Sequence, residues 1–154
     1  MDLEFKHFRQ EHYPEYASWF TDPDLNRWLG PMDTAWLDAV LCEPQSVGVT
    51  WAVFRDAALV AVVETCFDLQ DPLVCYIRAI ATKPALRGSG IGTAVLQHLF
   101  DRHARQGIAK HTTYISTHNP GSIRFFERLG FVRTTSEPNA HGYAEWRRAG
   151  QTSS

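Results

Sequence analysis

The sequence predicts a mixed α/β fold, in which helices pack on one mostly antiparallel sheet of about six or seven strands with a single parallel pair. The first observation is a run of β-branched and aromatic residues, broken only by short turns, between Val47 and Thr82. The second is a helix-like segment starting at Ile91 between two strand-like segments, which makes those two strands parallel neighbours. The chain of 154 residues fits one domain, expected over residues 1–148, and residues 149–154 are expected to form a frayed tail.

The first part of the chain predicts three short helices. Pro14 suits the first turn of the first helix. Asp22 is a capping residue followed by Pro23, which predicts a second helix that ends at Gly30. Asp33 predicts the start of a third helix by the same capping rule. The large apolar residues of these segments are Tyr16, Trp19, Phe20, Leu25, Trp28, Leu29, Trp36, Leu37, Val40 and Leu41.

Strands are predicted next, followed by alternating helices and strands. Val47–Phe54 and Leu59–Phe67 read as an antiparallel hairpin, and Leu73–Thr82 follows as a third strand. The helix after Ile91 ends near Gly107, where a helix cap belongs. The remaining predicted elements are a strand over His111–Thr117, a helix that starts after Asn119 and closes at Gly130, and two last strands, Phe131–Thr135 and Tyr143–Arg147.

Composition excludes several classes of protein. No apolar run reaches the ~20 residues that span a bilayer, so no membrane contact is expected. The charged N-terminus does not read as a signal peptide. Three cysteines, Cys42, Cys66 and Cys75, are an odd number without metal-like spacing. Free thiols in a reducing cytoplasm, with no bound metal, are therefore expected.

The charge of the chain is unevenly distributed although its net value is only −2. Up to Tyr76 there are 13 acidic against 4 basic residues, and from Ile77 onward 4 acidic against 11 basic. This asymmetry fits a polyanionic ligand on the second half and a cationic one on the first, although solvated faces would explain it equally well. The basic residues are dispersed, so no nucleic-acid partner is expected.

A glycine-rich turn is the strongest functional signal. Gly88, Gly90 and Gly92 stand at alternate positions directly before the predicted helix. Glycine tolerates positive φ and lets a ligand approach the backbone, and a helix start offers unpaired N–H groups at the positive end of its dipole. The turn therefore predicts a phosphate-binding site.

Two common phosphate motifs do not fit this turn. A P-loop requires a lysine and a hydroxyl residue after its last glycine, and no lysine follows Gly92 there. The dinucleotide fingerprint would require glycine where Thr93 or Val95 stands. A nicotinamide- or flavin-binding domain is kept only as a minor alternative.

The remaining pattern, Arg87-x-x-Gly90-x-Gly92, resembles the signature of the GNAT superfamily of N-acetyltransferases. Ala79–Pro84 is similar to the strand and proline turn that precede this signature, and Asn119–Phe131 is similar to the second motif of the superfamily. Trp19–Pro23 is similar to the N-terminal region of many members that act on small molecules. The resemblance covers essentially the whole chain and implies a GNAT-like sheet whose parallel pair is splayed apart.

The resemblance also implies roles for particular residues. Backbone N–H groups of the turn would hold the pyrophosphate of acetyl-CoA, and the strand before it would pair with the pantetheine amides. Asn119 would bind the pantetheine or orient the following helix, although capping that helix explains it equally well. The residues implied in binding are Ile80, Ala81, Thr82, Arg87, Gly88, Ser89, Gly90, Ile91, Gly92, Thr93, Asn119, Phe125, Phe126 and Arg128.

The catalytic groups are less clear, because Phe126 stands where many members carry a proton-donating tyrosine. Ser122, Tyr76 or Tyr114 could donate instead, or the thiolate could leave unaided, since a thiol of pKa ~8.5 is a fair leaving group. The resemblance implies the backbone N–H of Ile80 or Ala81 for the oxyanion. The candidates for the general base are Glu64, Asp68 and His118.

The expected reaction is direct transfer of an acetyl group to a primary amine of a small molecule or peptide in a ternary complex. The acidic and aromatic first half suits a cationic acceptor. The resemblance also implies a homodimer formed through the late strands. The alternative function is a non-catalytic acyl-CoA-binding or sensing module, which the missing tyrosine supports.

Overall fold

The computed structural model describes residues 1–150, and their backbone forms one seven-stranded sheet in the order β1-β2-β3-β4-β5-β7-β6. All neighbouring strands are antiparallel except β4 and β5, which are parallel. The predicted fold class is confirmed. The strands are β1 (Glu4–His7), β2 (Gly48–Arg55), β3 (Ala58–Phe67), β4 (Val74–Thr82), β5 (Lys110–Ser116), β6 (Val132–Arg133) and β7 (Tyr143–Ala149).

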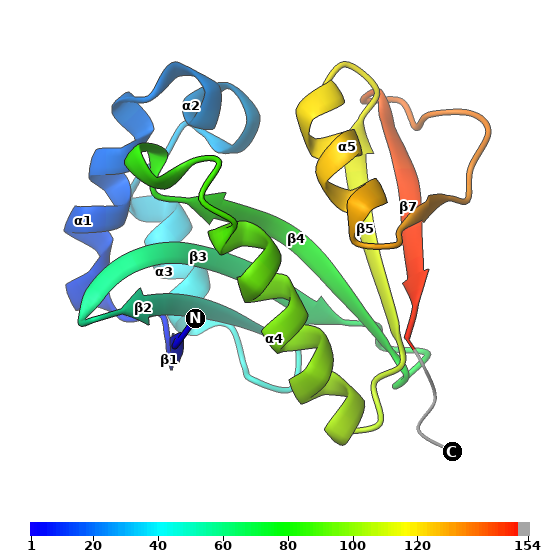
Figure 1. Cartoon of the computed structure of the whole chain (residues 1–154), viewed down its shortest axis with the longest axis horizontal. Helices are drawn as coiled ribbons and strands as arrows, with labels where there is room; N and C mark the ends of the chain where they lie inside the picture. The colour runs from blue at the N-terminus through cyan, green and yellow to red at the C-terminus, as the bar shows by residue number, and fades with distance from the viewer. Residues whose placement is uncertain (151–154) are drawn as a thin grey trace.

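Five α-helices accompany the sheet (Figure 1). They are α1 (Tyr13–Ser18), α2 (Pro23–Leu29), α3 (Thr34–Cys42), α4 (Ile91–Arg105) and α5 (Pro120–Arg128). Three predicted caps form as expected. Asp22 Oδ2 accepts from the Leu25 amide at 3.0 Å, Asp33 Oδ1 from Trp36 at 3.2 Å and Asn119 Oδ1 from Ser122 at 3.2 Å. Each cap satisfies an amide that has no acceptor one turn earlier in the helix.

The core lies on both faces of the sheet. One apolar cluster joins the sheet to α4 and α5 through residues such as Val95, Leu99 and Phe126. The other joins it to α1–α3 around the buried Tyr16 and Trp19. In the residues that the structure describes, no helix has the length and apolar content needed to cross a bilayer.

Two sequence predictions about the ends of the chain are corrected. The sequence predicts no strand over Glu4–His7, but this segment pairs with β2 and lets Phe5 pack against the core. The predicted tail begins at residue 149, yet Ala149 pairs with Lys110 and the Gly150 amide donates to the Ala109 carbonyl. Pairing with β2 orders the first segment and pairing with β5 orders the second. Only residues 151–154 of the predicted tail lie outside the described chain.

The last strands also differ in length from the prediction. The strand predicted over Phe131–Thr135 reduces to Val132–Arg133, which is an exposed edge strand that pairs with β7. The strand predicted over Tyr143–Arg147 extends to Ala149 along β5. The strands β5 and β7 lie next to α5 on one side of the molecule (Figure 1).

Candidate active site

The parallel strands β4 and β5 are paired only at their N-terminal ends. Their ladder contains three pairs, Val74–Lys110, Cys75–His111 and Tyr76–Thr112. Beyond these pairs the strands diverge, and a side-chain bond from Thr113 Oγ1 to the Ile77 carbonyl (3.0 Å) marks the start of the split. The facing edges of the two strands consequently leave backbone groups available to a ligand.

A bulge in β4 lies at the same place. The register between β3 and β4 moves from Glu64–Ala79 to Thr65–Ile77, which leaves Arg78 without a cross-strand partner on β3. A bulge bends its strand and increases its twist. The bend therefore contributes to the divergence of β4 from β5.

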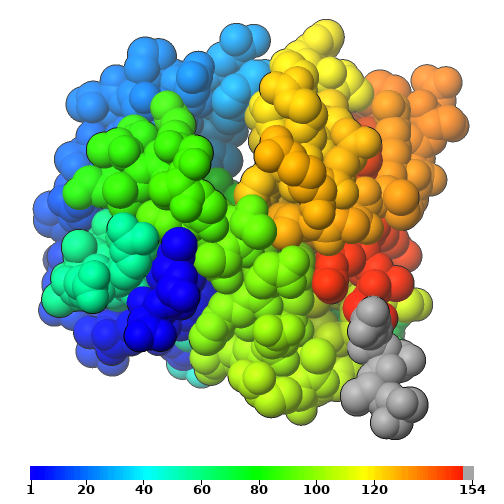
Figure 2. All heavy atoms as spheres, viewed as in Figure 1, coloured from blue at the N-terminus to red at the C-terminus, as the bar shows by residue number. Residues whose placement is uncertain are grey.

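The split opens into a cleft of about 740 Å³. Its walls are β4, the ends of β5 and α5, the turn before α4, and α2. Figure 2 shows the furrow between the N-terminal half and the part of the chain that carries α5. The cleft is lined by predicted site residues Ile80, Ala81, Thr82, Arg87, Gly92, Asn119, Ser122, Phe125 and Phe126.

The glycine turn has the backbone that the motif predicts. Gly88 and Gly90 have φ angles of 77° and 84°, a region that side chains other than glycine rarely adopt. Gly90 caps α4, and its carbonyl accepts from the Ala94 amide at 3.0 Å. The amides of Ile91, Gly92 and Thr93 precede this first bond and have no acceptor within the helix. They are available to an anion at the mouth of the cleft.

Gly92 is required for a different reason. A Cβ built at Gly92 would lie 3.2 Å from the ring of Phe125 on α5. The helices α4 and α5 therefore approach closely across the split, and the absence of a side chain at Gly92 keeps this passage narrow but open.

Arg87 makes a contact that the sequence did not indicate. Its guanidinium binds both carboxylate oxygens of Asp22, with Nη1 at 2.9 Å from Oδ1. The hydrogen bonds from Arg87, followed by the one from the Leu25 amide, lower the pKa of Asp22 to about 2. The turn before α4 is thus joined to the start of α2, although 65 residues separate the two in the sequence.

Asn119 and Ser122 lie together at the start of α5. In addition to its cap, Asn119 donates from Nδ2 to Ser122 Oγ at 3.0 Å. The serine oxygen is therefore an acceptor in this pair, and its own proton remains free to point elsewhere. Phe126 is 5% exposed and belongs to the core as well as to the cleft wall. Arg128 lies at the far end of α5 outside the cleft, where its Nε donates to the Arg124 carbonyl.

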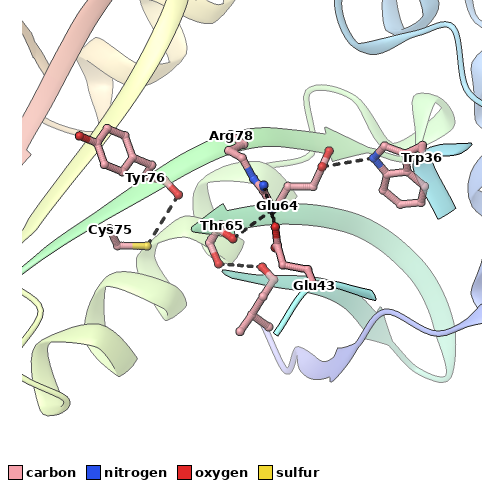
Figure 3. Close-up of polar contacts among 8 residues, drawn as sticks. Trp36, Glu43, Glu64, Thr65, Cys75, Tyr76 and Arg78 are labelled. Carbon is pink, nitrogen blue, oxygen red and sulfur yellow. Dashed lines mark hydrogen bonds and ion pairs between the residues drawn. The ribbon is translucent and has the colours of Figure 1, made fainter. Parts of the chain in front are cut away.

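Three of the predicted catalytic candidates, Glu64, Asp68 and Tyr76, do not line the cleft, whereas Tyr114 does. Glu64 points toward α3 and accepts from Trp36 Nε1 at 3.2 Å (Figure 3). Burial raises the pKa of Glu64. Beside it, Arg78 makes a two-pronged ion pair with Glu43, with a shortest distance of 2.7 Å. Glu64 therefore has the perturbed carboxyl expected of a base, but it lies behind the wall of the cleft.

Tyr76 faces a second cavity of about 560 Å³ that adjoins the cleft through Ile77, Arg78 and Tyr114. Its hydroxyl donates to Asp68 Oδ2 at 3.0 Å, and burial, followed by this bond, raises the pKa of Tyr76. Its proton is therefore already engaged. Of the three predicted candidates for the general base, Glu64, Asp68 and His118, only His118 lines the cleft.

Among the described residues, one group has the ligand atoms for a metal. Cys75, His103 and His111 are all buried, and their nitrogen and sulfur atoms lie within 4.8 Å of one another. His103 Nδ1 and His111 Nε2 are 2.8 Å apart and share a hydrogen bond. This bond uses one ring nitrogen of each histidine, while the other ring nitrogen of His111, Nδ1, is buried without a hydrogen-bond partner in the part of the chain that the structure describes.

A split parallel pair, with an amide-rich turn and a helix start at the mouth of the split, is the architecture of an acetyltransferase. The chain belongs to the acetyltransferase (GNAT) family, whose sequence profile matches residues 6–131. The predicted family is confirmed.

Relatives of the chain include one protein with a named substrate. An L-2,4-diaminobutyric acid acetyltransferase of Nocardia farcinica is 40% identical over 57 residues. The matched segment is 37% of this chain and only 30% of that relative's length.

Solved structures match nearly the whole chain. An acetyltransferase from Thermus thermophilus has a TM-score of 0.81 at 15% identity, over 97% of both chains. An aminoglycoside acetyltransferase in complex with coenzyme A and kanamycin has a TM-score of 0.79 at 17% identity, over 96% of this chain and 95% of the other. At such identities these likenesses establish the fold.

Proposed function

We propose that the cleft binds acetyl-CoA and that the chain transfers the acetyl group directly to a primary amine of a small molecule or peptide. The observation that carries this proposal is the split between β4 and β5, which leads to the unpaired amides at the start of α4. A strand edge can pair with an amide-containing chain, and a helix start can bind its phosphates. Coenzyme A contains both groups in one molecule.

The residues present fit this donor. The amides between Arg87 and Thr93 would hold the diphosphate, and the edge of β4 over Ile80–Thr82 would pair with the pantetheine arm. Phe125 and Phe126 of α5 would line the pantetheine arm, and so would Asn119, which caps the start of the same helix. The backbone N–H of Ile80 or Ala81 would stabilise the oxyanion when the amine attacks the thioester carbonyl.

His118 is proposed as the general base. An ammonium has no lone pair, so the acceptor must lose a proton before it attacks. A ring nitrogen of an imidazole can accept this proton, and His118 lines the cleft, whereas Glu64 faces Trp36 and does not line it.

His118→Gln is expected to lower kcat by about 100-fold at pH 7, because the variant keeps a polar side chain but loses the base. The affinity for CoA should not change. Steady-state kinetics at pH 7 measure kcat, and calorimetric titration measures the affinity for CoA. A larger loss of kcat in Glu64→Gln than in His118→Gln would contradict the assignment and favour the buried carboxylate.

Ser122 is proposed to assist the leaving thiolate, since its oxygen accepts from Asn119 while its proton remains free. Ser122→Ala is expected to lower kcat only about tenfold, because a thiol of pKa ~8.5 leaves with little help. Ser122→Thr keeps the hydroxyl and should retain most of the rate. Equal losses in both variants would indicate that Ser122 acts through packing.

The proposed activity is tested by following thiol release from acetyl-CoA with a panel of amines. The panel includes L-2,4-diaminobutyrate and an aminoglycoside, which are chosen from the names of similar proteins, together with polyamines and peptides with free N-termini. Turnover with one of these classes supports the proposal. Binding of acetyl-CoA without turnover across the whole panel would favour the non-catalytic sensor.

A further inference from the structure

The helix α2 forms a wall of the cleft that faces α5 (Figure 1). It contributes Asp24, Leu25, Arg27, Trp28 and Leu29 to the lining. The guanidinium of Arg27 lies 4.6 Å from the centre of the Trp28 ring. An acceptor bound in the cleft between α2 and α5 would therefore contact α2.

Two apolar side chains anchor α2 to the domain. The helix has seven residues, of which Leu25 is buried and Leu29 packs half-buried against the core. Helices this short are not stable by themselves. The position of α2 consequently depends on its contacts, and Asp22 supplies two of them: it caps the helix and binds Arg87.

Arg87 belongs to the proposed donor site at the same time. It stands three residues before Gly90, lines the cleft, and is bound to Asp22 through two of its five N–H donors. The remaining donors can meet a phosphate oxygen. The carboxylate of Asp22 would repel a phosphate placed directly beside it. The guanidinium of Arg87 can bind both anions at once and so can link Asp22 to the phosphate.

We propose that the Asp22–Arg87 pair couples donor binding to the acceptor wall, so that CoA bound at the turn fixes the position of α2. Asp22 is then a positioning residue that touches neither substrate. This inference rests on the proposed function. Coupling between two sites through a shared contact typically changes affinity by about 5- to 150-fold.

The test uses CoA itself and reads Trp28 directly. The protein is labelled with 5-fluorotryptophan, the Trp28 resonance is assigned with Trp28→Phe, and CoA is added while the ¹⁹F spectrum is recorded. In the wild type, CoA should shift and sharpen the Trp28 resonance. In Asp22→Asn, CoA should bind with a Trp28 shift reduced by at least about half, because asparagine keeps the cap but loses the ion pair.

Two further variants sharpen the result. Arg87→Lys keeps the positive charge but cannot donate to both carboxylate oxygens of Asp22 from two nitrogens, so it should also reduce the CoA-induced shift of the Trp28 resonance. Glu15→Gln is the matched control: it breaks the neighbouring ion pair of Lys83 with Glu15 (3.5 Å), which joins the same turn to α1, and it should keep the wild-type shift.

The outcomes separate the two proposals. An equal CoA-induced shift in wild type and Asp22→Asn would mean that CoA affects Trp28 by direct contact, which overturns the coupling. CoA binding in the wild type with no change at Trp28 also overturns it. No binding of CoA to the wild type would overturn the proposed function and the coupling with it.

Discussion

Gly90→Glu is expected to raise the Kd for CoA by about 100-fold or more, which corresponds to about 2.7 kcal/mol. Gly90 has a φ of 84° at the first turn of α4, and a side chain there strains the backbone that presents the amides. The added carboxylate would also stand where the diphosphate is proposed to lie, and like charges repel. Because the described chain leaves open space within 4 Å of a Cβ at Gly90, the variant has room to fold.

Gly107→Glu is the matched control for this prediction. Gly107 has a φ of 82°, also has open space around its Cβ position, and follows the opposite end of α4. It should lose similar stability to backbone strain while keeping the affinity for CoA. Equal loss of CoA binding in both variants would show that strain in α4, and not the anion site, causes the effect.

The largest expected effect on stability is destabilisation by acid through the buried histidine pair. Burial is the main cause that lowers the pKa of His103 to about 4, and the charge of Arg102 lowers it further. Burial likewise lowers the pKa of His111 to about 3, with further lowering by His103 and Arg148. Both imidazoles are therefore neutral in the folded protein and titrate near ~6.5 when unfolded. The unfolded state binds more protons below this value, so the free energy of unfolding falls as the pH falls from about 6.5 toward 4.

The loss should approach about 1.4 kcal/mol per pH unit for each histidine, on the order of 5 kcal/mol for both between about pH 6.5 and 4.5. Urea denaturation at several pH values measures this slope. His111→Gln removes one titrating group and keeps a hydrogen-bonding partner for His103. The free energy of unfolding of this variant should therefore fall less steeply with decreasing pH than that of the wild type, even if the variant is less stable at every pH. His141→Gln, at an exposed position, should leave the slope unchanged. An unchanged slope in His111→Gln would contradict the assignment.

The parts of the fold with local signals were predictable from the sequence. The capping residues Asp22, Asp33 and Asn119, together with the glycine turn at Gly88–Gly92, each act within a few residues of the chain. The strand at Glu4–His7 was missed because its exposed charged residues, Glu4 and Lys6, alternate with only two half-buried side chains, Phe5 and His7, that pack on Trp51. Only its pairing with β2 makes it a strand.

The catalytic residues were harder to predict, because the direction of a side chain depends on pairing. Tyr76 could have been placed from the alternation of β4: its neighbours Cys75 and Ile77 are buried, which turns Tyr76 to the other face. Glu64 faces α3 because β3 alternates in the same way next to Val63. The contact between Asp22 and Arg87 has no local signal and required the structure.

We propose that the turn before α4 binds the diphosphate of coenzyme A, and calorimetric titration tests this binding most directly. CoA and pantetheine, which lacks the diphosphate together with the adenosine and its 3′-phosphate, are titrated separately into the wild-type protein. We expect one CoA site per chain and an affinity for pantetheine at least about 100-fold weaker, the loss expected when charge-assisted hydrogen bonds disappear. Equal affinity for the two compounds, or no heat with CoA, would contradict it.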